Sequence, residues 1–231
     1  MEKHILVGID GSQASMAAVE YLGFVLGKNA RVKIDLLHIL PGIPPLFLEP
    51  GENMAELMLL QDFAGRVEEE NRNKAASMME EAKGILTRAG IDPAKIQPLI
   101  KERSFGVARD ILEMEHKGTY DVMVLGRHGM SAVEQFVMGS VTHKVLQHAS
   151  GVPLCVVHGK IEARKLLVTV DSCENSKRVL DKAGWLLGEA GPMEVMILHV
   201  VSPQIAEEMA SMWTGLIEME ATIEKRLIDD A

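Results

Sequence analysis

The chain has 231 residues, 47% of them hydrophobic and 25% charged, a composition typical of globular proteins that excludes a disordered or fibrous chain. The formal net charge of −9 comes without Lys/Arg clusters, which disfavours binding to nucleic acid or to an anionic membrane. The cysteines form no disulfide framework, no apolar run approaches the ~18 residues of a membrane span, and the first residues do not resemble a signal peptide. We therefore expect a cytoplasmic protein.

The first ninety residues predict strand, helix, strand and a long helix. A β-branched run at 5–9 ends at Asp10-Gly11-Ser12, where Ser12 is a residue type favoured as the N-cap of the next helix. A second strand is predicted over 32–40. It is followed by a proline-rich, apolar insert at 41–58, which could lie over a pocket or contact a partner, and the pattern is helical over 54–89.

The same alternation continues to residue 157. The predicted strands are 95–100, 120–125 and 153–157, and the predicted helices are 107–116 and 140–148. Strands and helices that alternate in this way form a parallel sheet covered on both faces, because right-handed crossovers place helices there. We therefore predict an α/β fold.

The sequence also contains an internal repeat. A shift of 161 residues aligns 165–201 with 4–40 without a gap. The matched residues include Asp10 with Asp171, Ser15 with Ser176, Gly23 with Gly184, Gly27 with Gly188 and His38 with His199. An apolar pattern alone would not bring these residues into register, so we predict a complete domain over 1–160 and a partial second repeat, strand–helix–strand–helix, over 161–231.

A glycine-spaced loop follows the strand predicted at 120–125. It reads Gly126-Arg127-His128-Gly129, then nine residues, then Gly139-Ser140-Val141-Thr142. Glycines allow the backbone to approach a ligand closely, and the free amides at a helix N-terminus attract anions. This order of strand, loop and helix predicts a phosphate cradle at the carboxyl end of a central strand, to which Ser140 and Thr142 could add hydroxyl donors.

The spacing Gly-x2-Gly-x9-Gly-Ser, with Asp10 after the first strand, resembles the ATP-binding branch of the universal stress protein family. The resemblance covers 1–158, and 165–230 is similar to the first half of a second such domain. It implies a Rossmann-like, adenine nucleotide alpha hydrolase-like fold, in which an open five-stranded parallel sheet of order 3-2-1-4-5 has helices on both faces. ATP would sit between the ends of the first and fourth strands.

The resemblance also implies roles for single residues. Asp10 would contact the ribose and adenine side, Ile39 would offer its backbone to the adenine edge, and Gly126 would approach the ribose. The phosphates would be held mainly by main-chain amides, and Mg²⁺ would bridge phosphate oxygens. The phosphate-binding residues would be Gly129, Gly139, Ser140, Val141 and Thr142.

Several residues keep a second interpretation. Asp10 also fits a helix-capping turn, and Arg127 and His128 fit either phosphate ligands, an acid–base pair, or a solvated loop arginine and a structural histidine. His38 and His199 fit strand-end residues that pack locally.

The predicted function is nucleotide binding as a regulatory state. Paired carboxylates, a nucleophile–histidine pair and metal-ligand spacing are not evident, so catalysis has little support. An oligomeric scaffold without physiological nucleotide and a slow ATPase remain as alternatives. The second copy contains half a site and should bind no ATP alone, and its first strand, 166–170, should present an open edge. A homodimer through 153–157 is implied by the resemblance.

Overall fold

The computed structural model describes residues 2–26, 31–43, 54–117, 120–129, 138–160, 164–171, 173–189 and 192–200. The chain divides into two compact units, of which the first contains residues 1–163 and 186–192 and the second contains residues 164–185 and 193–231. Each unit is described by itself. In the described part of the chain, no helix has the length and apolar character needed to cross a membrane.

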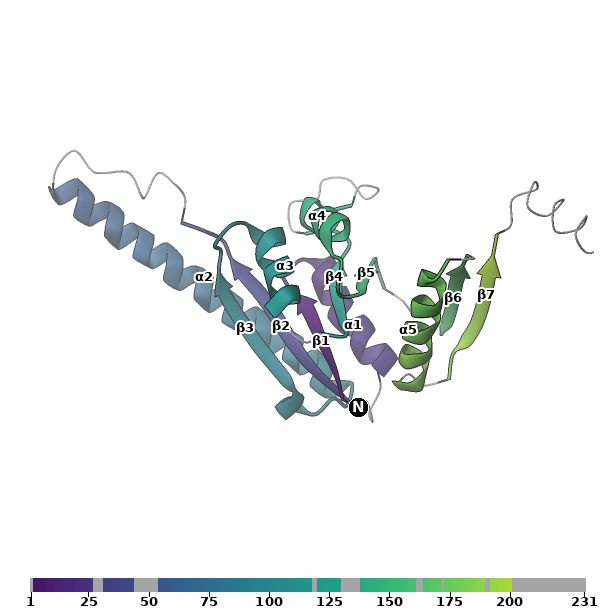
Figure 1. The fold of residues 1–231 in the computed structure, drawn as a ribbon. Helices are drawn as coiled ribbons and strands as arrows, with labels where there is room; N and C mark the ends of the chain where they lie inside the picture. Colours follow the sequence, from purple (N-terminus) through teal and green to yellow (C-terminus); the bar gives the residue numbers. More distant parts are fainter. Residues whose placement is uncertain are drawn as a thin grey trace, which may run out of the picture. The chain divides into compact units, whose positions relative to one another are not determined.

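The first unit is an α/β structure with a five-stranded parallel sheet (Figure 1). Its strands are β1 (Lys3–Gly8), β2 (Val32–Leu40), β3 (Ile96–Glu102), β4 (Val122–Gly126) and β5 (Leu154–Val157). Its helices are α1 (Gln13–Leu26), α2 (Met54–Arg88), α3 (Val107–Lys117) and α4 (Ser140–His148), with a 3-10 turn η2 (Pro93–Lys95). The order β3-β2-β1-β4-β5 confirms the predicted sheet, and the bounds differ from the predicted ranges by at most two residues.

The apolar sequence of the central strand, β1, follows from its position in the sheet. Ile5, Leu6 and Val7 of β1 are all buried, because β1 has neighbouring strands on both sides and helices over both faces. One face carries α1 and α2, and the other carries α3 and α4. Leu6 belongs to the core under α3 and α4, together with Leu37, Met123, Leu125, Ile111 and Val145.

Three polar side chains are joined inside this core. Asp35 of β2 is 5% exposed and accepts a hydrogen bond from the Tyr120 hydroxyl at 2.9 Å. The His4 imidazole of β1 brings its Nε2 to 2.9 Å from the same carboxylate oxygen. Burial and the bond to anionic Asp35 raise the pKa of Tyr120, so the hydroxyl remains a donor at ordinary pH. The cluster therefore links β1 and β2 to the segment that enters β4.

The second unit consists of β6 (Lys165–Val170), α5 (Asn175–Glu189) and β7 (Glu194–His199), and β6 pairs with β7 in parallel. The pairing repeats the register of the first unit: Lys165 lies opposite Glu194 as His4 lies opposite Lys33, a separation of 29 residues in both pairs. The 161-residue shift thus aligns strand pairing as well as sequence. The interpretation of this unit as a partial second domain stays a prediction.

We expect Asp35→Ala to lower the free energy of unfolding by about 3 kcal/mol, because it leaves the buried Tyr120 hydroxyl without its acceptor and removes the carboxylate that lies 2.9 Å from His4 Nε2. Urea unfolding followed by circular dichroism measures the change. The control is Asp92→Ala, which removes an exposed carboxylate that accepts from the Ala94 amide and should cost ~1 kcal/mol or less. Equal losses in the two variants would contradict the role given to the buried cluster.

Candidate functional site

The turn after β1 is held by its own side chains. Asp10 Oδ1 accepts from the Ser12 amide at 3.0 Å, and Gly11 takes the left-handed conformation with φ of 79°. Ser12 Oγ accepts from the Ser15 amide at 3.1 Å, which confirms Ser12 as the N-cap of α1. The Ser15 hydroxyl donates to the Ser12 carbonyl at 3.0 Å and accepts from the Asp10 amide at 3.4 Å. The carboxylate of Asp10 is therefore positioned at the carboxyl edge of the sheet.

The end of β4 lies directly against the first turn of α1. A Cβ on Gly126 would stand 2.6 Å from the carbonyl carbon of Ala14 and 2.7 Å from the amide nitrogen of Ser15. These are backbone atoms, so no side chain fits at this position. The close approach expected of Gly126 is thus made to α1, which lies beside the turn that carries Asp10.

The loop after β4 and the turn after β1 meet. A Cβ on Gly129 would come within 2.7 Å of Asp10 Oδ2, so the carboxylate lies directly over this glycine. The Ser12 hydroxyl donates to the His128 carbonyl at 3.4 Å and ties the two segments together. The structure therefore brings Asp10 and Gly129, which are 119 residues apart in the sequence, to one place.

Gly139 joins this loop to α4. Its amide donates to the Arg127 carbonyl at 2.8 Å, and a Cβ on it would lie 3.2 Å from that oxygen and from His128 Cα. Gly139 occupies the N-cap position of α4 and has no side chain to cap the helix. Within the described residues, no hydrogen bond reaches the amides of Ser140, Val141 and Thr142, so they are available to an anion.

The two hydroxyls of the helix start differ. Ser140 is exposed, whereas Thr142 is buried and its hydroxyl donates to the Gly126 carbonyl at 2.8 Å. The Thr142 hydroxyl proton, expected at a phosphate, is thus engaged inside the protein and fixes α4 to the end of β4. The main-chain amide of Thr142 remains the group that can face a ligand.

Ile39 lies one residue before the end of β2, with its side chain in the core under α3 and α4. The register Gly8↔Leu37, extended by two residues, places Asp10 and Ile39 at the same level of the carboxyl edge. His38 has a role that the sequence did not indicate: its Nδ1 donates to the Ile9 carbonyl at 2.7 Å. This bond fixes the chain just before the Asp10 turn.

Arg127 and His128 have different surroundings. The Arg127 amide donates to the Val157 carbonyl at 2.8 Å, which extends the pairing of β4 with β5. The His128 ring stands edge-on to His158 with 5.6 Å between ring centres. Both ring nitrogens of His128 are buried and have no hydrogen-bond partner among the described residues. A buried imidazole without a partner is a candidate for binding a ligand.

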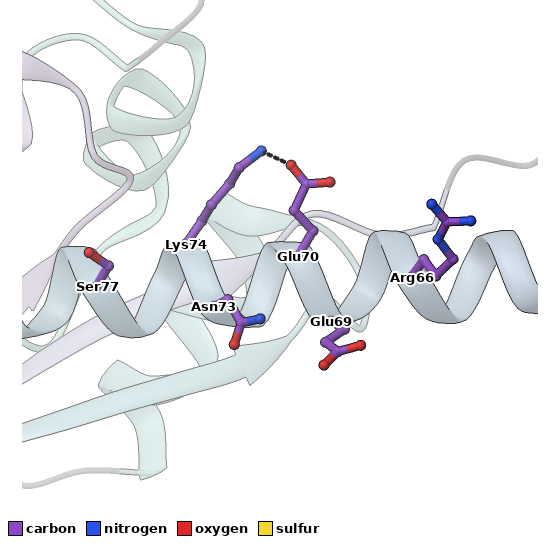
Figure 2. A pocket seen from close by; sticks show the side chains of 6 residues that line it. All are labelled: Arg66, Glu69, Glu70, Asn73, Lys74 and Ser77. Atoms are coloured by element: carbon purple, nitrogen blue, oxygen red, sulfur yellow. Dashed lines mark ion pairs between the residues drawn. The ribbon is translucent and has the colours of Figure 1, made fainter.

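Other features lie outside this constellation. The described residues contain no group of three or more His, Cys, Asp or Glu side chains that could hold a metal ion. A cavity of about 490 Å³ lies instead along α2 and is lined by charged and polar side chains (Figure 2). Its lining residues are Arg66, Glu69, Glu70, Asn73, Lys74 and Ser77.

The comparison with known families is decisive for the first unit. A sequence model of the universal stress protein family matches residues 1–158. The chain belongs to this family. A universal stress protein of Mycolicibacterium smegmatis is 29% identical over 165 residues, which are 70% of this chain and 50% of that protein. A putative universal stress protein of Staphylococcus aureus is 22% identical over 64% of this chain and 79% of its own length.

Solved structures of this family share the fold. The hypothetical protein MJ0577 is 22% identical with a TM-score of 0.51, over 70% of this chain and 99% of that one. A universal stress protein from Archaeoglobus fulgidus is 20% identical with a TM-score of 0.61, over 95% of this chain and 75% of that one. This chain therefore spans half the length of its M. smegmatis relative and three quarters of the Archaeoglobus structure.

Two glycines of the site should respond differently to alanine. Gly126→Ala forces a Cβ into the backbone of α1 and should cost ~2–3 kcal/mol of stability. Gly129→Ala meets only the tip of the Asp10 carboxylate, which can swing aside, so its stability should stay within ~1 kcal/mol of the original.

Urea unfolding of both variants measures the difference. Gly184→Ala in α5 is the control, because a Cβ there meets nothing within 4 Å, and it should be neutral or slightly stabilising. Equal destabilisation at Gly126 and Gly129 would show that their neighbours are not as described.

Proposed function

We propose that this universal stress protein binds ATP in the first unit and that nucleotide occupancy regulates its interactions. The single observation that carries the proposal is the meeting of the Asp10 carboxylate with Gly129 and the N-terminus of α4. A carboxylate suits the ribose hydroxyls, and free amides with a helix dipole suit phosphates. The family match and the Gly-x2-Gly-x9-Gly-Ser spacing support the same assignment.

In this proposal the ligand lies across the carboxyl ends of β1, β2 and β4. The Asp10 side chain and the Ile39 main chain take the ribose and adenine, and Gly126 lets α1 approach so closely that the Asp10 turn stands beside the end of β4. The amides of Gly129, Ser140, Val141 and Thr142 face the phosphates, and the Ser140 hydroxyl adds a donor. The Gly139 amide is bonded to the Arg127 carbonyl, so Gly139 contributes by leaving its side-chain position free. Mg²⁺ would arrive with the nucleotide, because the phosphates themselves supply its oxygen ligands.

The second unit supports a stoichiometry of one ATP per chain. It repeats the turn of the first site: the Asp171 amide donates to Ser176 Oγ at 2.8 Å, and Asp171 Oδ1 accepts from the Cys173 amide at 3.0 Å. The Gly-x2-Gly-x9-Gly-Ser spacing lies at 126–140, in the first unit, and residues 165–231 do not repeat it. The second unit corresponds to the adenine and ribose half of a site.

We also propose that the chain forms a homodimer through β5, as the family resemblance implies. Among the described strands, β5 is paired only with β4, so its outer edge is open to a partner. An oligomeric scaffold that works without nucleotide is the alternative that shares this edge.

A slow ATPase is a second candidate function, favoured by the buried and unpartnered ring of His128, which belongs to the loop between Gly126 and Gly129. An imidazole is the usual general base near neutral pH. The binding role is preferred because His128 has no carboxylate partner among the described residues to orient its ring.

The first test is nucleotide content and titration. Denatured, purified protein should release adenine nucleotide, and calorimetry of nucleotide-free protein should give one ATP site per chain. Gly129→Val and Gly139→Val should weaken ATP binding more than tenfold, because each side chain displaces Asp10 or the 127–129 backbone. Gly184→Val is the matched control and should bind as the original does. Absence of released nucleotide together with no titration signal would remove the proposal.

The second test separates binding from hydrolysis. We expect phosphate release from ATP to stay at the buffer background over hours, both in the original protein and in His128→Ala. Turnover that is present in the original and lost in His128→Ala would replace the regulatory role with an ATPase role. ATP binding is measured in the same samples for both proteins, so that a lack of phosphate release cannot result from a lack of bound ATP.

A further inference from the structure

The longest helix projects beyond the sheet that it covers. Helix α2 has 35 residues and is therefore about 52 Å long, whereas β2 with 9 residues spans about 30 Å. Its most deeply buried residues are Ala75, Met79, Ala82 and Leu86, all in the C-terminal half. The N-terminal half therefore extends past the sheet, as Figure 1 shows.

The side of α2 that faces away from the sheet carries a regular stripe, which we call the outer seam. Its residues are spaced alternately by four and three positions: Leu59, Phe63, Arg66, Glu70, Asn73 and Ser77. Residues at this spacing share one face of a helix, and on this face Leu59 and Phe63 are apolar whereas the other four are polar or charged. The side chain of Leu59 is 71% exposed and that of Phe63 is 47% exposed. The other four seam residues are exposed and line the open cavity along α2. In Figure 2, Glu70 and Ser77 leave the helix on one side of the view and Asn73 leaves it on the other.

Within one chain, the two charged residues of the outer seam, Arg66 and Glu70, are not paired with each other. Arg66 has no acidic partner among the described residues. Glu70 is bonded to Lys74 at 2.6 Å, and this bond lowers the pKa of Glu70, so the carboxylate stays ionised. A carboxylate accepts from several donors at once, which leaves Glu70 able to bind a second cation.

We propose that the outer seam is a homodimer surface, on which α2 of two copies of this chain pairs antiparallel with Arg66 of each copy facing Glu70 of the other. The register follows from the charges. A parallel pair would place Arg66 against Arg66 and Glu70 against Glu70, whereas the antiparallel pair turns both contacts into salt bridges. The same register places Phe63 opposite Asn73 and Leu59 opposite Ser77 of the second copy, and these short side chains leave room for the larger ones.

This surface is separate from the sheet edge proposed for family-type pairing. Helix α2 packs on β2 and β3, and β5 is the strand farthest from β3 in the sheet. The outer seam also ends beside the candidate site. Met78 follows Ser77, and its sulfur would lie 2.9 Å from a Cβ on Gly11, in the turn that carries Asp10. Pairing through the seam does not itself require that ATP binds.

Charge exchange on the full-length chain tests the proposal. Sedimentation equilibrium should show an association step that Arg66→Glu and Glu70→Arg each weaken about tenfold or more, because each variant creates two like-charge contacts. The double variant Arg66→Glu/Glu70→Arg should restore the dissociation constant to within about threefold, because it rebuilds both salt bridges with reversed sign. Lys177→Glu on α5 changes the net charge as Arg66→Glu does and should leave the step unchanged.

Cross-linking tests the register without relying on charge. The variant Phe63→Cys/Asn73→Cys, with exposed Cys173 replaced by serine, should form covalent dimers with a short bis-maleimide, whereas Phe63→Cys alone should not. Burial raises the pKa of the Cys155 thiol to about 11, so this residue contributes little thiolate. Three results would each overturn the proposal. They are a monomeric protein, a dissociation constant that neither charge variant changes, and a double variant whose dissociation constant does not return towards that of the original protein.

Discussion

The arrangement of the first unit depends on the absence of a side chain at Gly126. Because nothing projects from this residue, the backbone of Ala14 and Ser15 at the start of α1 lies directly against the end of β4. The contact brings the turn of Asp10 beside the loop of Gly129, and the Ser12 hydroxyl then reaches the His128 carbonyl. The carbonyl of Gly126 accepts from Thr142, so α4 is positioned from the same residue. One glycine therefore positions three segments of the candidate site.

Much of this unit could be predicted from the sequence because its signals are local. Apolar runs, breakers and glycine spacing are read along the chain, and they predicted the strands, the helices and the glycine loop, whereas the strand order came from the family resemblance. Three contacts join residues that are far apart in the sequence, and no local pattern encodes them. They are the contact of Gly126 with α1, the bond of Thr142 to the Gly126 carbonyl and the bond of His38 to the Ile9 carbonyl. Ser15 is the exception, because its recurrence as Ser176 was a signal of its bond to the Asp10 turn.

The second unit shows how the same local pattern behaves where the described residues form only two paired strands. In the first unit β1 lies between β2 and β4, and Leu6 is buried; its counterpart Leu167 on β6 is exposed. Every residue of β7 is exposed, whereas nearly all of β2 is at least half-buried. The turn, the helix start and the strand register are thus set by local sequence, while burial depends on neighbouring strands. Exposed apolar strands of this kind favour contact with further protein.

The two sides of helix α2 differ, because one packs on the rest of the first unit and the other is exposed. Towards the sheet and α1 it carries alanines, and a Cβ on Gly23 of α1 would meet Ala89 at 2.8 Å, so this side is shaped for close approach. Away from the sheet it carries the exposed apolar residues Leu59 and Phe63, followed by polar and charged residues. Since Met78 lies between these two sides and against Gly11, a partner on the outer seam and a nucleotide at Asp10 would act on the same turn. The contact of Met78 with Gly11 thus joins the helix that carries the outer seam to the turn that positions Asp10.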